Sequence, residues 1–502
     1  MTERDLAAGI DASEIGEDCV VAGEVDGEPV VLLRSGGKLC ALAGLCTHAK
    51  APLADGIVAD GTLRCPWHHA RFDVATGEAV DAPAFAPLQR FEVVEENGTV
   101  RVGEPVAAAE ATAAPARDIG RVVIVGGGAA GHACAEMLAR HGAGSAVTML
   151  SDEAEAPYDR TACSKAYLAG EAERGDLPLP APDGAEIRLG ISVERIDREA
   201  RLVHPAVGEA VPYDTLILAT GAEPIVPEFE GADRDDVHVV RTLADADALI
   251  AAAQEGRRAI VIGSSYIGLE VAASLIARGM AVTIVSDAAI PLEKTAGAEV
   301  GAMIRRLHEE KGVTFLAERS VTAWDGTAAT LDDGSRVEGD LLVAGTGVKP
   351  RVALAEAAGL TLADEDEGGG VSVDAMLRTS DPAIHAIGDI ANAPDPRLGH
   401  PIRVEHWAVA QHMGQWLARH LLGLVDGGYD KVPFFWSGHY DVNLRYVGHV
   451  ETPDDACVDG DIDARDFALH LKEDGREQAL LTCNRDRAAL EFERDLERGS
   501  AG

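Results

Sequence analysis

The sequence has few cysteines, few basic residues relative to acidic ones, and no long apolar run. Eight cysteines in 502 residues do not suggest a disulfide scaffold, and we interpret them as metal ligands, buried thiols or redox groups. No apolar run reaches the roughly 18 residues that a membrane-spanning helix needs. The first residues, MTERDLAAGID, lack the basic and apolar segments of a secretory signal. We therefore expect a cytoplasmic protein with no membrane partner.

The charge is strongly acidic. The chain carries 44 Lys and Arg against 84 Asp and Glu, which gives a formal net charge of −40. Such a surface repels phosphate backbones, so no nucleic-acid partner is expected. The acidity fits solubility, and it also fits steering of a basic partner. A hydrophobic fraction of 47% is enough for several packed cores.

Hydrophobic patterning divides the chain into parts. Residues 1–103 contain short apolar runs separated by Gly and Asp turns, which indicates a β-rich unit. Residues 104–118 are rich in Ala with Pro at both ends and are interpreted as a linker. Two strand–glycine turn–helix–strand units then start at Arg121 and Arg258, which is typical of dinucleotide-binding domains. The tail over 426–502 returns to mixed strand and helix patterns.

Four candidate metal ligands lie in the first unit. Cys46 and His48 form a C-x-H pair, and Cys65 and His68 form a C-x-x-H pair. This spacing places one thiolate and one imidazole at each of two neighbouring loops. Four such ligands could hold a tetrahedral zinc ion, or a Rieske [2Fe–2S] cluster in which two Cys bind one iron and two His bind the other.

The residues around these ligands favour the cluster. The segments CTH and CPWHHARFDVATGEAV resemble the Rieske ferredoxin family, whose second loop reads Cys-Pro-x-His followed by an aromatic, Asp and a Thr-Gly turn. High-potential members carry an extra cysteine pair between the loops. Ala51 and Trp67 stand at those positions here, so the resemblance implies the low-potential branch. His69 stands where Gly is usual and is expected at the surface.

Two glycine fingerprints suggest two nucleotide sites. Gly126, Gly128 and Gly131 follow the strand VVIV and open a helix, so the backbone can approach a pyrophosphate at the helix N-terminus. The next strand ends in SDE, where Asp152 or Glu153 can bind a ribose hydroxyl.

The second fingerprint is imperfect. It contains Gly263 and Gly268, but Ser265 takes the middle glycine position. The strand after it ends at Ser286 and Asp287, with no Lys or Arg nearby for a 2′-phosphate. This pattern favours NADH over NADPH.

From Gly120 to about Thr452 the chain resembles the FAD-dependent ferredoxin reductases and apoptosis-inducing-factor-like reductases of the glutathione reductase fold. The resemblance rests on PYDRTACSKAYLAG, LILATGAEP, AIHAIGDIA, IRVEHWAVAQHMG and VPFFWSGHYDVNLRYVGH. With the first unit included, nearly the whole chain is similar to Rieske-bearing apoptosis-inducing-factor-like proteins.

The resemblance implies a multidomain fold: a β-rich Rieske domain, an α/β flavoprotein with two dinucleotide-binding domains, and an α+β C-terminal domain. The implied limits are residues 1–103 for the Rieske domain, 104–118 for the linker, 119–233 and 351–425 for the FAD-binding domain, 234–350 for the NAD-binding domain, and 426–502 for the C-terminal domain.

The resemblance also implies site residues. Arg160 is expected along the FAD, Lys165 near flavin N5, and Glu270 beside the nicotinamide. Lys165 and Glu270 are the expected catalytic pair, although without the family they read as a surface ion pair. Further expected cofactor-binding residues come from the other family segments: Thr220, Gly221, Gly388, Asp389, Glu405, His406 and Trp407. The helix after Trp407 is expected to direct its N-terminus at the flavin.

The function expected from this combination is an NADH-dependent oxidoreductase that passes electrons through FAD and the cluster to an unidentified electron acceptor. His48 and His68 are expected to face solvent as a docking edge. Alternatives are a thiol or disulfide reductase using Cys163, which we interpret mainly as a buried thiol, and a slow redox sensor. His132 and Cys134 are interpreted as packing residues. A homodimer is compatible with the sequence.

Overall fold

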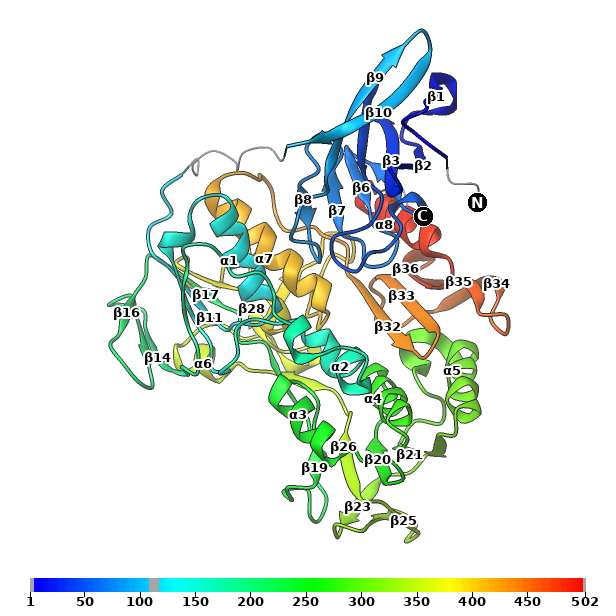
Figure 1. Cartoon of the computed structure of the whole chain (residues 1–502). Coiled ribbons are helices and arrows are strands. Elements are labelled where there is room, and N and C mark those ends of the chain that lie inside the picture. Colours follow the sequence, from blue (N-terminus) through cyan, green and yellow to red (C-terminus); the bar gives the residue numbers. More distant parts are fainter. Residues whose placement is uncertain (1–3, 108–116, 500–502) are drawn as a thin grey trace.

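The computed structural model describes residues 4–107 and 117–499. Figure 1 shows the β-rich N-terminal unit lying against the last helix and against helix α7, while the central region extends away from it. Part of the expected linker, residues 108–116, lies outside the described residues. None of the helices in the described part is long and apolar enough to cross a membrane.

The N-terminal unit has two antiparallel sheets. The larger sheet has the order β1-β10-β9-β4-β3-β2 and the smaller one the order β5-β6-β7-β8. The larger sheet consists of β1 (Ile10–Asp11), β2 (Val20–Val25), β3 (Glu28–Ser35), β4 (Lys38–Ala43), β9 (Arg90–Glu96) and β10 (Thr99–Val106). The smaller sheet consists of β5 (Ile57–Ala59), β6 (Thr62–Arg64), β7 (Arg71–Asp73) and β8 (Ala79–Asp81).

Strand β3 is apolar without alternation because both of its faces are buried. Successive side chains of a strand point to opposite faces. Val31 and Leu33 pack with Phe72 in the group of buried side chains that also contains the two candidate ligand cysteines. Val30 and Leu32 pack in a separate hydrophobic group on the other face. The smaller sheet is thereby fixed to the larger one, which places the two metal-ligand loops side by side.

The FAD-type domain is built on a parallel sheet of order β13-β12-β11-β17-β29. Its strands are β11 (Val122–Val125), β12 (Val147–Leu150), β13 (Glu186–Arg188), β17 (Thr215–Leu218) and β29 (Ile384–Ala386). Helices α1 (Ala129–Arg140) and α7 (Trp407–Leu422) pack together on it. The last strand comes from far along the chain, so the domain is assembled from two segments.

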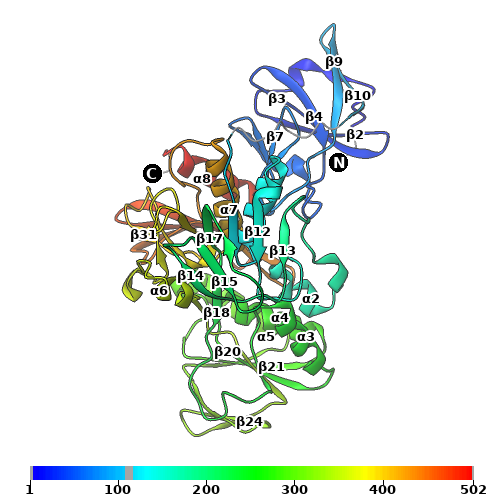
Figure 2. The same ribbon diagram turned by 90° about the vertical axis from the view of Figure 1, so that its left-hand side faces the viewer.

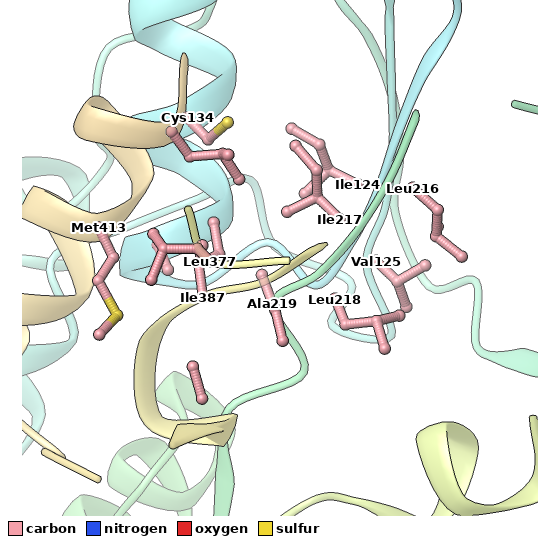
Figure 3. Close-up of a cluster of buried hydrophobic side chains, with 14 of the residues drawn as sticks. Ile124, Val125, Cys134, Leu216, Ile217, Leu218, Ala219, Leu377, Ile387 and Met413 are labelled. Carbon is pink, nitrogen blue, oxygen red and sulfur yellow. The ribbon is translucent and has the colours of Figure 1, made fainter. Parts of the chain in front are cut away.

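The core of this domain lies between that sheet and the helix pair. Figure 3 shows Ile124 and Ile217 of the sheet near Cys134 of α1, with Met413 of α7 close by. Cys134 is fully buried there. This confirms the prediction that Cys134 is a packing residue.

The NAD-type domain is inserted between those segments. Its parallel sheet has the order β19-β26-β20-β21-β22. The strands are β19 (Val237–His238), β20 (Arg258–Ile262), β21 (Ala281–Ser286), β22 (Thr314–Ala317) and β26 (Leu341–Ala344), and the helices are α3 (Leu243–Ala252), α4 (Tyr266–Ala277) and α5 (Glu293–Glu310).

The C-terminal domain is an antiparallel sheet followed by one helix. Its order is β32-β33-β36-β35-β34. The elements are β32 (Phe434–His439), β33 (Val442–Gly448), β34 (Asp455–Asp461), β35 (Asp466–Glu473), β36 (Arg476–Cys483) and α8 (Asp486–Glu497). In both views α8 lies next to the N-terminal unit (Figures 1 and 2).

Smaller elements connect these parts. They are α2 (Ala166–Ala169), α6 (Ala353–Ala357), β14 (Val193–Asp197), β15 (Leu202–Pro205), β16 (Val211–Pro212), β18 (Ala222–Pro224), β23 (Val321–Trp324), β24 (Ala328–Leu331), β25 (Arg336–Glu338), β27 (Val348–Pro350), β28 (Val371–Ser372), β30 (Ala391–Pro394) and β31 (Pro401–Ile402).

Candidate functional site

The four predicted metal ligands converge from two loops. Cys46 and His48 lie between β4 and β5, and Cys65 and His68 lie between β6 and β7. The two thiols share a hydrogen bond, and the two imidazole Nδ1 atoms are 3.1 Å apart. Within residues 4–107 and 117–499, no three His, Cys, Asp or Glu side chains meet as a single-ion site. These donors instead form a sulfur pair and a nitrogen pair.

The pKa values of the four side chains reflect their burial and the contact between the two thiols. The hydrogen bond from Cys65 holds the pKa of the Cys46 thiol below its usual value, and the same interaction together with burial raises the pKa of Cys65. Burial lowers the pKa of His48 and His68. Neutral imidazoles keep a lone pair for a metal. A sulfur pair beside a nitrogen pair is the donor set of a Rieske cluster.

His69 is not at the surface, which corrects the sequence-based expectation. It is fully buried. Its Nδ1–H donates to Glu493 of α8 at 2.9 Å, and its ring stacks on Phe434 of β32 at a centroid distance of 3.8 Å. Its φ of 58° explains why Gly is usual at this position in the family. The histidine at this position therefore forms a contact between the N-terminal unit and the C-terminal domain.

A buried charge network surrounds that contact. Arg71 donates to Glu493 at 2.9 Å and also to Glu497. Arg64 lies 2.9 Å from Glu497 and is 1% exposed. Burying charged groups is costly unless they are paired. The two carboxylates of α8 thus pair with the arginines that flank the second ligand loop.

A second network ties the same unit to the FAD-type domain. Asp81 of β8, which is buried, lies 2.7 Å from Lys431 and 3.2 Å from Arg419 of α7. Arg140 of α1 donates to the carbonyl oxygens of Ala79 and Phe85 at 2.6 and 2.8 Å. The N-terminal unit is therefore docked on both neighbouring domains by polar contacts.

His68 is half-buried, and one side of its ring contacts another domain, which the sequence did not predict. Its ring packs on Trp436 of β32 with a centroid distance of 4.3 Å. Arg445 donates to the carbonyl oxygen of Trp67, 3.2 Å away, and so holds the backbone of the same loop. His48 is half-buried. The imidazole edge of the metal site is thus turned toward the chain's own C-terminal domain.

Trp436 also lines a cavity of about 620 Å³ between the domains. Most of the predicted cofactor-binding residues line the same cavity: Gly126, Gly128, Asp152, Arg160, Lys165, Thr220, Gly221, Glu270, Gly388, Asp389, Glu405, His406 and Trp407. Gly131, Gly263, Gly268 and Asp287 do not line it.

The glycines of the first fingerprint fit a bound dinucleotide. A Cβ on Gly131 would lie 2.0 Å from the carbonyl oxygen of Gly126, so helix α1 approaches the strand only because this residue is Gly. A Cβ on Gly128 would meet nothing closer than Arg160 at 4.0 Å. The space at Gly128 therefore remains open at the helix N-terminus, where a pyrophosphate is stabilised.

The two acidic residues after β12 have different partners. Asp152 is exposed and lies 3.1 Å from Arg351. Glu153 accepts hydrogen bonds from Arg160 and from the Tyr158 hydroxyl, each at 2.5 Å. Both acids line the cavity, and Asp152 has the more accessible carboxylate.

Several cavity residues were missed by the sequence analysis. Arg241 donates to the buried carboxylate of Asp389 at 2.6 Å, and it lies close to Gly221. It supplies a basic group near the ATG segment, where the local sequence has none. Arg351 and Trp436 were missed too. No local motif marks these residues, because each reaches the cavity through long-range packing.

Lys165 and Glu270 form an ion pair inside the cavity. The Nζ atom is 2.9 Å from Glu270 Oε2, and Glu270 is 3% exposed. Ser164 and Ser437 donate to the two carboxylate oxygens at 2.7 and 2.6 Å. Three partners fix this carboxylate, so the pair is not a plain surface ion pair.

Helix α7 begins at the cavity. His406 is its N-cap residue and Trp407 its first helical residue, and both line the cavity. Burial lowers the pKa of His406 to about 3, so its ring is neutral. The unpaired N–H groups of a helix N-terminus favour negative charge in front of them.

Two remaining residues behave as packing groups. Cys163 lines the cavity but is buried, and burial raises the pKa of its thiol to about 12. A thiol with so high a pKa carries almost no thiolate at neutral pH.

His132 is buried as well. Its Nε2–H donates to the Pro180 carbonyl at 2.7 Å, and its ring contacts Phe85 of the N-terminal unit edge-on.

The second fingerprint forms a tight turn, but its acidic residue does not line the cavity. Gly263 and Gly268 approach one another closely, as a Cβ on Gly268 would lie 2.4 Å from the Gly263 carbonyl oxygen. Ser265 donates to the Gly345 carbonyl at 2.9 Å. Asp287 is exposed. The turn thus has the shape of a dinucleotide fingerprint, while its acid stands outside the described cavity.

Known families match three regions of the chain. The pyridine nucleotide-disulphide oxidoreductase family matches residues 120–414, the Rieske [2Fe-2S] domain matches residues 8–92, and the reductase C-terminal family matches residues 434–501. These matches confirm the predicted resemblance and the predicted fold class.

Individual relatives agree. The chain is 40% identical over 374 residues to the anthranilate 1,2-dioxygenase system ferredoxin–NAD(+) reductase component of Burkholderia cepacia, covering 72% of this chain and 90% of that protein. It is 28% identical over 480 residues to apoptosis-inducing factor 3 of Mus musculus, covering 91% and 78%. The putidaredoxin reductase–putidaredoxin covalent complex gives a TM-score of 0.71 at 32% identity, covering 76% of this chain and 93% of that one.

Proposed function

The chain belongs to the pyridine nucleotide-disulphide oxidoreductase family, with a Rieske domain ahead of the family's region, and from this we propose that electrons pass from its flavin site to its own Rieske site. The protein is an FAD-dependent NAD(P)H oxidoreductase of the ferredoxin reductase type with a [2Fe–2S] centre. One observation carries the proposal: the His68 ring packs against Trp436, and Trp436 lines the cavity that holds the predicted flavin residues.

We propose Cys46, His48, Cys65 and His68 as the cluster ligands. Their sulfur pair and nitrogen pair support this assignment. For the FAD we propose the tight turn at Gly126 and the open backbone at Gly128, Asp152 for the ribose, Arg160 beside it, and the residues Thr220, Gly221, Gly388, Asp389, Glu405, His406 and Trp407. An FAD held by these residues would supply the chemistry that converts a two-electron hydride donor into single-electron transfers.

The roles of Lys165 and Glu270 are proposed from their positions. The Lys165 ammonium group can stabilise negative charge that develops at the edge of a bound ring, because it acts in a site from which water is partly excluded. Glu270 holds that ammonium group at 2.9 Å. The N-terminus of α7 adds a second source of positive potential on the same cavity.

NADH rather than NADPH is the proposed electron donor. Asp287 follows β21 of the second fingerprint, in which Gly263 and Gly268 form the turn, and an acid at this place favours a free ribose hydroxyl. The final acceptor is proposed to be a separate redox protein or small molecule. All eight cysteines fall within the described residues and none of them forms a disulfide, which is usual in the reducing cytoplasm, the proposed location.

The domain limits given above from the sequence are retained as a proposal, with the linker over residues 104–118. A homodimer remains compatible with the chain, and the transfer proposed here needs only one copy.

The experiment follows reduction of the cluster after holoprotein is mixed with excess NADH. Samples are frozen at fixed times and read by electron paramagnetic resonance at a series of protein concentrations. We expect a rate that does not depend on protein concentration, since the transfer is within one chain. A rate that rises in proportion to concentration would contradict the proposal.

A matched pair of variants sharpens this test. Trp436→Ala removes the ring between the cavity and His68 and is expected to slow reduction of the cluster while leaving reduction of the flavin unchanged. Trp67→Ala removes the neighbouring, 37% exposed ring, whose centre is 6.4 Å from that of His68, and serves as the control. Equal effects of the two variants would show that Trp436 has no special position.

A further inference from the structure

A chain of hydrogen bonds leads from Glu270 away from the cavity. Ser437 donates to Glu270 Oε1 at 2.6 Å, and Ser437 Oγ is 3.2 Å from His439 Nε2. His439 Nδ1 is 3.4 Å from His308 Nε2. His308 Nδ1 is 3.3 Å from the Tyr440 hydroxyl. Four consecutive contacts thus join the cavity to the hairpin between β32 and β33.

Every contact in this chain has one donor and one acceptor. An ionised Glu270 only accepts, so the Ser437 hydroxyl donates to it and accepts from His439 Nε2–H. His439 Nδ1 then accepts from His308 Nε2–H, and His308 Nδ1 accepts from the Tyr440 hydroxyl. When the carboxyl group of Glu270 carries a proton, the same contacts can run in the opposite sense, since a hydroxyl group and a neutral imidazole can each donate or accept.

The middle of the hydrogen-bonded chain is buried and its two imidazoles are neutral. His308 and His439 are fully buried and Ser437 is 1% exposed. Burial lowers the pKa of both histidines to about 3. A neutral imidazole has one protonated and one free nitrogen, so it can take up a proton on one side and release one on the other.

The hydrogen-bonded chain reaches the surface at its Tyr440 end. Tyr440 is half-buried, and the exposed Lys311 at the end of α5 places its Nζ 5.5 Å from the centre of the Tyr440 ring. At the inner end, Glu270 is 3% exposed and has little direct access to water. The hydrogen-bonded chain connects the two ends.

The reaction requires a proton to leave. Oxidation of one nicotinamide dinucleotide yields its oxidised form, two electrons and one proton. Iron accepts the two electrons in two single steps and takes no proton. We propose that Glu270 accepts this proton inside the cavity and that Ser437, His439, His308 and Tyr440 conduct it to bulk water. Each imidazole exchanges its tautomer as the proton passes.

This inference rests on the proposed function, because it takes the Lys165–Glu270 pair as the place where hydride chemistry occurs. It adds His308, His439 and Tyr440 as residues that act through Glu270. None of the three lines the described cavity. They are therefore separable from cofactor binding in an experiment.

The test uses His439→Gln in the holoprotein. An amide can fill both hydrogen-bonding positions of the imidazole, but it does not pass a proton on. Tyr440→Phe is the second variant, since it removes one hydroxyl from a half-buried residue. His385→Gln is the control. His385 is another buried histidine (4% exposed), and it lies in β29, away from the hydrogen-bonded chain.

Each protein is mixed with NADH and ferricyanide in weak buffer with a pH indicator. We expect unchanged reduction of the flavin, and proton release slowed about 10-fold or more in His439→Gln and Tyr440→Phe, as for loss of a proton-transfer group. His385→Gln should match the unaltered protein. If His439→Gln and Tyr440→Phe both release protons at the original rate, the relay is wrong. If the unaltered protein shows no reduction of flavin by NADH, the proposed function itself fails.

A second readout does not depend on turnover. Nitrogen-15 spectra of histidine in the oxidised holoprotein at pH 7 should show His308 and His439 each with one protonated ring nitrogen, assigned by their loss in His308→Gln and His439→Gln. A doubly protonated ring at either position would overturn the relay, because it has no free nitrogen to accept a proton.

Discussion

Single residues of the same type have different chemistry here because their surroundings differ. Cys46 and Cys65 share a hydrogen bond that favours one thiolate, whereas burial raises the pKa of Cys163 to about 12. A thiol with so high a pKa is protonated at neutral pH and attacks disulfides poorly. The position of Cys163 in the cavity wall is thus insufficient for a redox role.

Replacing Cys163 tests this reading. We expect Cys163→Ser to keep its flavin, its iron and its NADH–ferricyanide activity within about twofold, because the change removes a group that is neutral at pH 7. Steady-state activity and cofactor content are the measurements. Abolished activity with normal cofactor content would instead support a thiol-based reaction.

At this scale the sequence predicted ligands better than environments. The four metal ligands were predicted because their spacing is local. The burial of His69 was not, since its partner Glu493 is more than four hundred positions away and carries no motif. The same holds for Arg241, whose contact with Asp389 depends on how separate segments pack.

Among the elements, helix α8 has a particular role. Its carboxylates Glu493 and Glu497 pair with Arg64 and Arg71 beside the second ligand loop. The sequence predicted a mixed strand and helix tail, but nothing in its pattern predicted that this helix contacts the first domain. The contact fixes the orientation of the imidazole edge toward Trp436.

Glu493→Gln is the corresponding prediction. Removing one partner of a buried ion pair destabilises by about 3–5 kcal/mol, and here the loss falls on domain docking. We expect slower transfer from flavin to cluster, with unchanged reduction of the flavin by NADH, in rapid-mixing experiments.

The matched control is Glu491→Gln. Glu491 lies on the same helix, but its partner is Arg487 on the helix itself and its side chain is 40% exposed. Equal transfer rates in the two variants would show that α8 does not orient the cluster domain.

At the scale of the whole molecule, the sequence was sufficient for the family and the order of domains. The glycine fingerprints and the Rieske loops are local signals that each define a domain. The relative placement of domains was not predictable, because it depends on buried contacts such as Asp81 with Lys431 and His68 with Trp436. The sequence therefore led us to expect solvent-facing cluster histidines, whereas both are half-buried and His68 packs on Trp436.

Stability should fall as the pH is lowered. Six buried histidines away from the cluster have lowered pKa values of about 3 to 4: His132, His308, His385, His406, His412 and His439. Below the unfolded pKa of about 6.5 the unfolded chain binds protons that the native chain does not, so each group contributes up to about 1.4 kcal/mol of lost stability per pH unit.

The acidic residues at the docking surface act in the same sense. The pKa values of Asp81 and Glu493 are held below their usual range by neighbouring cations despite burial. Their contribution is present above the unfolded values near 4 and is lost as the pH falls below them. We expect the melting temperature of the holoprotein to drop steadily from pH 7 to pH 5 and more steeply below pH 4.5. A melting temperature that is constant or rises over this range would contradict the burial of these groups.

The central claim is that one chain carries electrons from a nicotinamide dinucleotide to iron held by Cys46, His48, Cys65 and His68. Its most direct test is the low-temperature electron paramagnetic resonance spectrum of holoprotein reduced with NADH, recorded beside Cys65→Ser and the half-buried control Cys40→Ser. We predict a reduced Rieske signal in the unaltered protein and in Cys40→Ser, and none in Cys65→Ser. A protein whose flavin is reduced by NADH but whose iron signal is absent, or is unaffected by Cys65→Ser, would contradict the account.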